Sequence, residues 1–153
     1  MKFYEDLIVG ETRQYGSYQV DREEVIDFAS KYDPQAFHLD DDAAAQTFFG
    51  RLSASGWHTA AMMMRMNVDS WADEQQAGLG SPGIDELKWL RPVYPGDTLR
   101  CETTLIEKRR SASRRDMGLL KSRTDVFNQD DVKVMSMIAN GLIKVRNPDV
   151  DTE

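Results

Sequence analysis

The chain has 153 residues, 41% of them hydrophobic and 29% charged, which suits one soluble domain with a core of its own. A formal net charge of −7 argues against nucleic-acid binding by the domain as a whole. With two histidines and a single cysteine, the chain lacks the ligands of a typical transition-metal site, so no metal is expected.

The compartment and the domain count follow from what the sequence lacks. No apolar run approaches the roughly 20 residues that cross a bilayer, and acids interrupt the start of the chain where a signal peptide needs an apolar core. The lone Cys101 is compatible with a reducing cytoplasm. We therefore expect a cytoplasmic protein, without a membrane partner, that forms one domain over residues 1–153 with a short flexible tail at about 147–153.

Helical signals dominate the first third of the chain. Asp21 has the chemistry of a helix N-cap, Glu24 follows three residues later, and three acids at residues 40–42 favour another helix start. The predicted elements here are a leading segment (1–14), a strand (Tyr15–Val20), a helix (Arg22 to about Lys31), a turn (Asp33–Leu39) and a short helix ending near Gly50.

A longer helix is predicted from Trp57 to about Trp71. Apolar residues cover most of its circumference, as expected for a helix that other structure surrounds. It carries four methionines within five positions, at residues 62–66. Methionines can form a ligand-binding surface, but filling irregular space in a core is the favoured interpretation.

After a glycine-rich connection at residues 78–83, the apolar pattern changes to a period of two. The predicted strands are a run that includes Leu87 and Trp89, then Leu99 to about Arg109, Leu119–Asn128 and Val132–Arg146. Asn128–Asp131 is a plausible hairpin turn between the last two. Helices followed by consecutive hairpin-connected strands predict an α+β fold with a mostly antiparallel sheet.

The segment Asp33–His38 places a carboxylate and an imidazole five residues apart. Pro34 disfavours helix here, so the two side chains can converge across a turn. A carboxylate and an imidazole around one water are a minimal device for adding or removing water. The alternative is purely structural: an aspartate that bonds to the backbone of a turn, and a histidine without a chemical role.

Gly56 immediately precedes the longer helix, whose first N–H groups lack intrahelical partners and carry partial positive charge. A thioester carbonyl placed there would be polarised, and glycine lets it approach the backbone closely. The alternative, a glycine that serves only the turn, is compatible with this role.

These residues carry a family resemblance. The run from Asp33 to His38 resembles the Asp-x-Asn-Pro-x-His motif of MaoC-like (R)-specific enoyl-CoA hydratases, with Gln35 and Ala36 in place of asparagine and proline. The resemblance continues through Ala54–Ala61 and Arg91–Leu99. It implies a hot-dog fold, in which a curved antiparallel sheet wraps around a central buried helix.

The resemblance also implies roles for individual residues. Asp33 and His38 would be catalytic, and Gly56 would supply an oxyanion-hole N–H; His58 lies outside the family's catalytic motif. The expected substrate-binding residues near them are Gln35, Phe37, Ser55 and Trp57. For the phosphates of coenzyme A, the densest basic run supplies Arg109, Arg110 and Arg114, although a solvated hairpin tip explains that run equally well.

The implied reaction is reversible hydration of a trans-2-enoyl-CoA, or dehydration of a 3-hydroxyacyl-CoA. It needs no cofactor beyond the coenzyme A of the substrate, and the family implies a homodimer or a higher homo-oligomer. Two alternatives remain open. Other hot-dog proteins are acyl-CoA thioesterases, and the fold also serves as a non-catalytic acyl-CoA-binding or dimerisation module. The spacing of Asp33 and His38 favours hydration.

Overall fold

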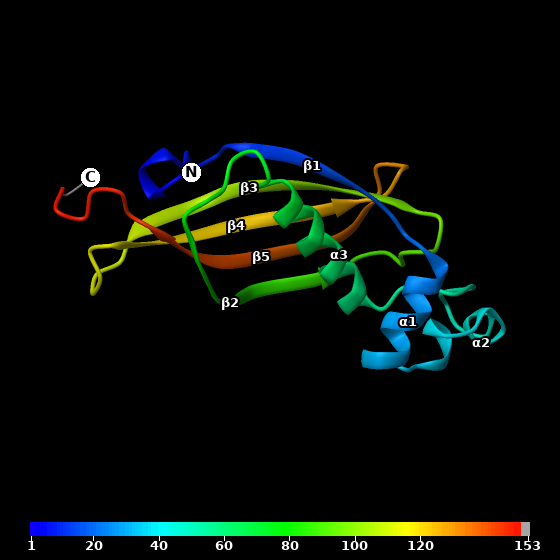
Figure 1. Cartoon of the computed structure of the whole chain (residues 1–153). Helices are drawn as coiled ribbons and strands as arrows, with labels where there is room; N and C mark the ends of the chain where they lie inside the picture. Colours follow the sequence, from blue (N-terminus) through cyan, green and yellow to red (C-terminus); the bar gives the residue numbers. More distant parts are fainter. Residues whose placement is uncertain (151–153) are drawn as a thin grey trace.

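Five antiparallel strands form one curved sheet that runs along the molecule (Figure 1). The strands are β1 (Thr12–Gln19), β2 (Gly78–Trp89), β3 (Thr98–Arg110), β4 (Met117–Phe127) and β5 (Lys133–Lys144). Their spatial order is β1-β3-β4-β5-β2, so the first two strands in sequence form the two edges of the sheet. The computed structural model describes residues 1–150.

The longest helix, α3 (Gly56–Asp69), lies against this sheet and contacts β1 and β3. Two shorter helices, α1 (Arg22–Tyr32) and α2 (Asp41–Ala45), gather at one end of the molecule (Figure 1). Short 3-10 turns lie at Tyr4–Asp6 and Ala36–His38. Asp21 and Asp40 cap α1 and α2 by accepting hydrogen bonds from backbone N–H groups three residues later.

The inner face of α3 builds the core. Met62, Met63 and Met66 are buried, whereas Met64 is 52% exposed on the outer face of the helix. The buried methionines pack with side chains from the middle of the sheet: Leu99, Cys101, Val126 and Met135. The α+β prediction is confirmed. The expected core role holds for three of the four methionines and is wrong for Met64, and the helix begins one residue earlier than expected and ends at Asp69.

The glycine-rich connection was the main error of the sequence-based prediction, because residues 78–83 belong to β2. Gly80 and Gly83 have φ values of +109° and +154° and lie where the pairing of β2 with β5 shifts register. β2 is an edge strand exposed along almost its whole length. A strand with two solvated faces shows no alternation of apolar and polar residues, so the expected signal is missing.

The last described residues form hydrogen bonds with the body of the molecule. The backbone N–H of Asn147 donates to Glu5, and the guanidinium of Arg110 donates to the carbonyls of Pro148 and Val150. The rest of the predicted tail, residues 151–153, lies outside the described residues. Within residues 1–150, no helix is long and apolar enough to span a membrane.

Candidate active site

Asp33 and His38 lie on opposite sides of a short turn at the end of α1. The chain leaves α1 at Asp33, whose N–H donates to the carbonyl of Ala29 at 2.9 Å. Pro34 prevents the helix from continuing, and the 3-10 turn Ala36–His38 then brings the imidazole back. Nε2 of His38 ends 3.5 Å from Oδ2 of Asp33. The predicted convergence of the two side chains is therefore present in the structure.

The imidazole of His38 has a fixed orientation. The ring is buried, and its Nδ1 lies 2.7 Å from the carbonyl oxygen of Ser53. A carbonyl only accepts hydrogen bonds, so Nδ1 carries the proton. In the neutral ring, Nε2 is consequently an acceptor. It faces the carboxylate of Asp33, which also accepts, so a single water can donate to both.

Three neighbours determine the charge state of Asp33. Burial raises the pKa of this carboxyl, but hydrogen bonds from Ser55 and Gln35 and the nearby His38 outweigh burial and leave the pKa below its usual value. Ser55 Oγ donates to Oδ2 at 2.7 Å, and Gln35 Nε2 donates to Oδ1 at 2.7 Å. Asp33 is thus a carboxylate at neutral pH, suited to accept a proton or to orient a water.

The same serine leaves the start of α3 open. Ser55 is the N-cap residue of α3, but its hydroxyl is committed to Asp33 and makes no capping hydrogen bond. The first intrahelical bond of this turn joins the N–H of Thr59 to the carbonyl of Ser55. The N–H groups of the first turn therefore have no intrahelical acceptor and can donate to a ligand.

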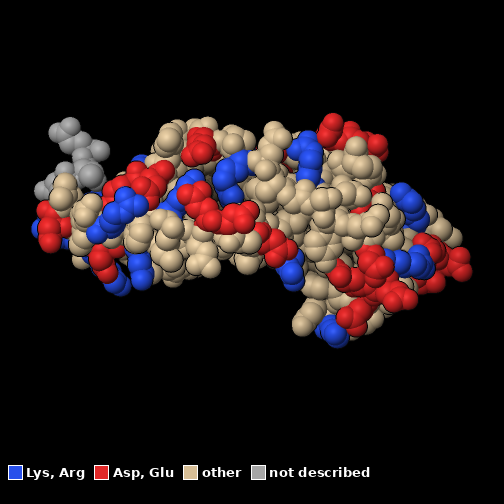
Figure 2. Space-filling view, turned by 45° about the horizontal axis from the view of Figure 1, so that its top comes forward, with Lys and Arg blue, Asp and Glu red and all other residues tan. Residues whose placement is uncertain are grey.

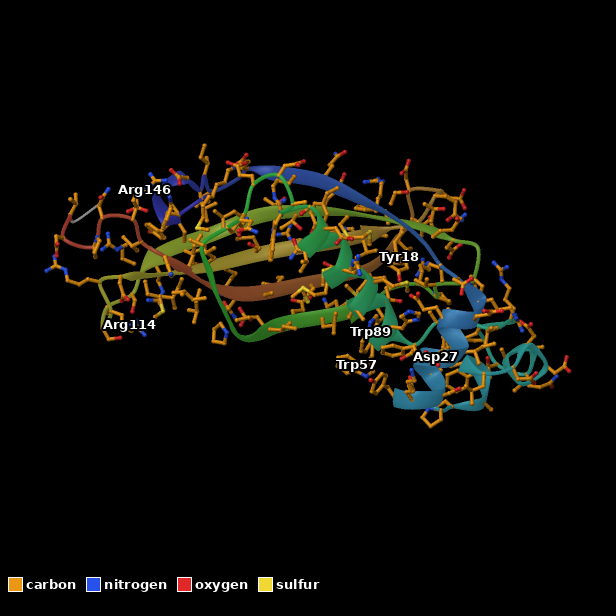
Figure 3. All side chains as sticks on the ribbon, viewed as in Figure 1. Tyr18, Asp27, Trp57, Trp89, Arg114 and Arg146 are labelled. Atoms are coloured by element: carbon orange, nitrogen blue, oxygen red, sulfur yellow. The ribbon has the colours of Figure 1, made fainter. Side chains whose placement is uncertain are left out.

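A cavity of about 340 Å³ brings these parts together. Asp33, His38 and Gly56 all line it. Its walls are mainly apolar or aromatic: Phe48, Phe49, Ala54, Trp57, Trp89, Leu90, Pro92, Val93 and Val134. Figure 3 shows Trp57 and Trp89 side by side near the start of α3. A larger cavity of about 510 Å³ lies along the rest of α3, away from Asp33 and His38.

The other predicted pocket residues divide into two groups. Gln35 and Trp57 line the cavity, while Ser55 is fully buried and acts on Asp33. Phe37 packs edge-on against His38, with ring centroids 4.5 Å apart, and against Phe49. Its place in the structure is behind the imidazole rather than on the cavity wall.

The predicted phosphate-binding arginines are far from this cavity within one chain. Trp89 pairs with Met135, which pairs with Val126, which in turn pairs with Cys101, so Trp89 and Cys101 lie at the same height on the sheet. Arg110 follows Cys101 by nine residues along β3. At about 3.3 Å per residue, the basic hairpin lies roughly 30 Å along the strands. Figure 3 shows Arg114 near the left end of the molecule and Trp57 to the right of its centre.

Arg91 and Trp89 are cavity residues that the sequence did not reveal. Arg91 is exposed, and its guanidinium donates to the carbonyl of Leu90 at 2.9 Å. Both residues belong to the end of β2 and the segment after it. Only the strand order places that end beside the start of α3, so no local pattern identifies them.

His58, the second histidine, is buried on α3 but does not line the cavity. Its Nε2 lies 3.0 Å from Glu24 Oε1, and its ring stacks on Phe28 at 4.7 Å. These contacts tie α3 to α1.

Known proteins resemble this chain in sequence and in fold. The family model of the MaoC like domain matches residues 6–126. A MaoC-like dehydratase from Rhodospirillum rubrum is 39% identical, with a TM-score of 0.88 over 95% of this chain and 99% of that one. A mesaconyl-CoA hydratase from Cereibacter sphaeroides is 35% identical over 65 residues, which are 42% of this chain and 19% of that protein.

The fold extends to more distant proteins. The R-hydratase PhaJ1 from Pseudomonas aeruginosa superimposes with a TM-score of 0.66 at 23% identity, covering 99% of this chain and 94% of that one. The five-stranded curved sheet with its helix is the hot-dog fold of these hydratases, as expected from the sequence.

Proposed function

Because the chain belongs to the family of MaoC-like dehydratases, we propose that it catalyses the reversible hydration of a trans-2-enoyl-CoA to a 3-hydroxyacyl-CoA. The observation that carries this proposal is the Asp33–His38 pair, which faces one cavity together with the uncapped start of α3. The reaction requires acid–base groups that exchange protons with the water, and N–H donors that bind the carbonyl oxygen of the thioester.

In this proposal, Asp33 and His38 hold the attacking water between Oδ2 and Nε2. One of them removes a proton from the water while its oxygen bonds to C3 of the enoyl group. The electron pair of the double bond moves toward the thioester carbonyl, and a proton is then delivered to C2. Because the two groups are close and interact, they act as one acid–base unit rather than as two separable ones.

The N–H groups at the start of α3 would bind the thioester oxygen. Negative charge grows on that oxygen as the water attacks, and the partial positive charge of the helix N-terminus stabilises it. Gly56 supplies an N–H, and its lack of a side chain leaves room for the indole of Trp89 against the first turn of the helix. The acyl chain would lie against the aromatic wall of Phe49 and Trp57, and no cofactor beyond the substrate's coenzyme A takes part.

The anionic end of coenzyme A requires a cation. Acidic residues gather over the end of the molecule that carries α1 and α2 (Figure 2), where they would repel phosphate. Arg91 is the one arginine or lysine that lines the cavity among the described residues. We therefore assign the first phosphate contact to Arg91, while Arg109, Arg110 and Arg114 remain candidates if the active molecule is an oligomer.

A homodimer is also part of the proposal. β2 leaves one edge of the sheet unpaired within the described chain, and Leu79, Ile84 and Trp89 on it are between 41% and 53% exposed. An open edge with apolar side chains favours association with another copy. Sedimentation equilibrium of the purified protein should give twice the mass of one chain or a higher multiple, and a monomer would contradict the dimer.

The reaction class is tested with crotonyl-CoA and longer or branched trans-2-enoyl-CoAs. Loss of the enoyl absorbance is followed in parallel with release of free thiol. Hydration predicts loss of absorbance without thiol. Release of thiol would instead identify a thioesterase, and binding without either signal would identify a non-catalytic acyl-CoA-binding module.

A further inference from the structure

Trp89 connects the edge strand β2 to the first turn of α3. Its indole Nε1 donates to the carbonyl oxygen of Gly56 at 2.8 Å. The ring also covers the Cα of Gly56, because a Cβ built there would stand 2.4 Å from Cε2 of the indole. The ring of Trp57 also contacts Trp89, with the two ring planes nearly perpendicular and their centroids 5.0 Å apart. One side chain therefore fixes Gly56 by a hydrogen bond and by packing.

The Cα of Gly56 is the joint between two peptide units. One unit carries the N–H of Gly56, and the other carries the carbonyl of Gly56 and the N–H of Trp57. Because the rigid indole packs against this Cα, it limits the rotation about the backbone φ and ψ bonds that glycine otherwise permits. A hydrogen bond to the carbonyl also polarises its peptide unit, which makes the N–H of Trp57 a stronger donor.

We propose that Trp89 is a positioning residue that holds the amide donors of Gly56 and Trp57 on the thioester oxygen. The inference rests on the proposed function of this site. Trp89 does not take part in proton transfer. It acts through the backbone of Gly56, where Ser55 gives no side-chain cap and a flexible glycine would otherwise set the donor geometry alone.

The test compares Trp89→Phe, Trp89→Leu and Trp71→Phe. The first removes the indole N–H and keeps an aromatic ring on Gly56, and the second removes both. Trp71→Phe is the matched control, since Trp71 lies at the other end of α3, away from the Asp33 cavity, and its buried Nε1 makes no hydrogen bond to the described residues. Circular dichroism and thermal unfolding verify that each variant folds.

The first readout is the split between kcat and KM in the hydration of crotonyl-CoA. Trp89→Phe should lower kcat about tenfold with little change in KM, less than the ~10²–10³ typical of losing a direct oxyanion donor. Trp89→Leu should lose more, and Trp71→Phe should match the wild type. Unchanged kcat in Trp89→Phe, or a rise in KM alone, would overturn the positioning role and leave Trp89 as a wall of the acyl site.

The second readout does not depend on turnover. A conjugated aryl-acryloyl-CoA absorbs at longer wavelength when its carbonyl is polarised, so the spectrum of the bound ester reports the donors directly. We expect a red shift with the wild type and a smaller shift with Trp89→Phe. A red shift without hydration would refute the proposed function and preserve this inference. An equal shift in the wild type and in Trp89→Phe would refute the positioning role of Trp89 and leave the proposed function standing. The absence of any shift with the wild type would also refute the positioning role.

Discussion

At the scale of single residues, Asp33 shows how neighbours set the chemistry of a carboxyl group. Burial alone would push this group toward its neutral form, which cannot accept a proton. The hydroxyl of Ser55 and the amide of Gln35 each donate to one of its oxygens and reverse that effect. The residue thus combines a sheltered position with a negative charge, and the combination depends on these two uncharged side chains together with the nearby His38.

Replacing Ser55 tests this balance. Ser55→Ala should raise the pKa of Asp33, because burial then acts against fewer stabilising hydrogen bonds. Titration of the Asp33 carboxyl carbon by NMR measures the change. Ser53→Ala is the matched control, since the buried Ser53 hydroxyl has no hydrogen-bond partner in the described structure. An Asp33 pKa that is the same in both variants would contradict the assigned role of Ser55.

The same shift has a consequence for stability. A carboxyl whose pKa is lowered in the folded state stabilises the fold above its unfolded pKa, and this contribution disappears as pH falls through the folded value. Ser55→Ala should therefore lose stability at neutral pH and lose less on acidification than the wild type. Urea unfolding at pH 7 and at pH 3 measures the difference.

Arg91 carries a second prediction at this scale. Arg91→Gln should raise KM for an enoyl-CoA several-fold while kcat stays near the wild-type value, because the guanidinium would bind phosphate without touching the reacting atoms. Higher salt should weaken this difference by screening the interaction. If KM instead responds to Arg114→Gln and not to Arg91→Gln, the basic hairpin is the phosphate site.

At the scale of elements, α3 separates two roles along one helix. Its first turn lines the cavity that contains Asp33 and His38, and its buried methionines pack against the sheet and fix the position of the helix. Met62→Ala should cost about 2–5 kcal/mol of unfolding free energy, as truncation of a buried side chain leaves a cavity. Met64→Ala, on the exposed face of the same helix, should cost less than about 0.5 kcal/mol. Equal losses in urea unfolding would contradict this placement of the helix.

Sequence patterns predicted α3 from its many apolar residues and most of the sheet from a period of two. The expectation that other structure surrounds α3 on most sides was wrong for the single chain, because Trp57 and Met64 on this helix are 59% and 52% exposed. The first half of β2 was not predicted as a strand, because a solvated edge strand rich in glycine shows no alternation of apolar and polar residues. The Asp33–His38 pair was predictable because a turn joins residues close in sequence. Trp89 was not, because its partner Gly56 lies 33 positions earlier and only the folded sheet brings the two together.

At the scale of the whole molecule, Cys101 reports on the integrity of the core. It is fully buried in β3, an interior strand of the sheet, and burial raises the pKa of its thiol to about 12. The reactive thiolate is therefore scarce at neutral pH, and reagents reach it only when the core opens. Labelling by a disulfide reagent should be slow in the native protein and fast in denaturant. Rapid stoichiometric labelling of the native protein would contradict this burial.

The central claim is that Asp33 and His38 act as one unit on a water. The most direct measurement is the rate of crotonyl-CoA hydration by the wild type, Asp33→Asn, His38→Ala and the double variant. Each single change should lower kcat by about 10²–10⁴, and the double variant should be scarcely slower than the slower single one. Losses that multiply would show two independent roles, and a single variant with wild-type activity would contradict the account.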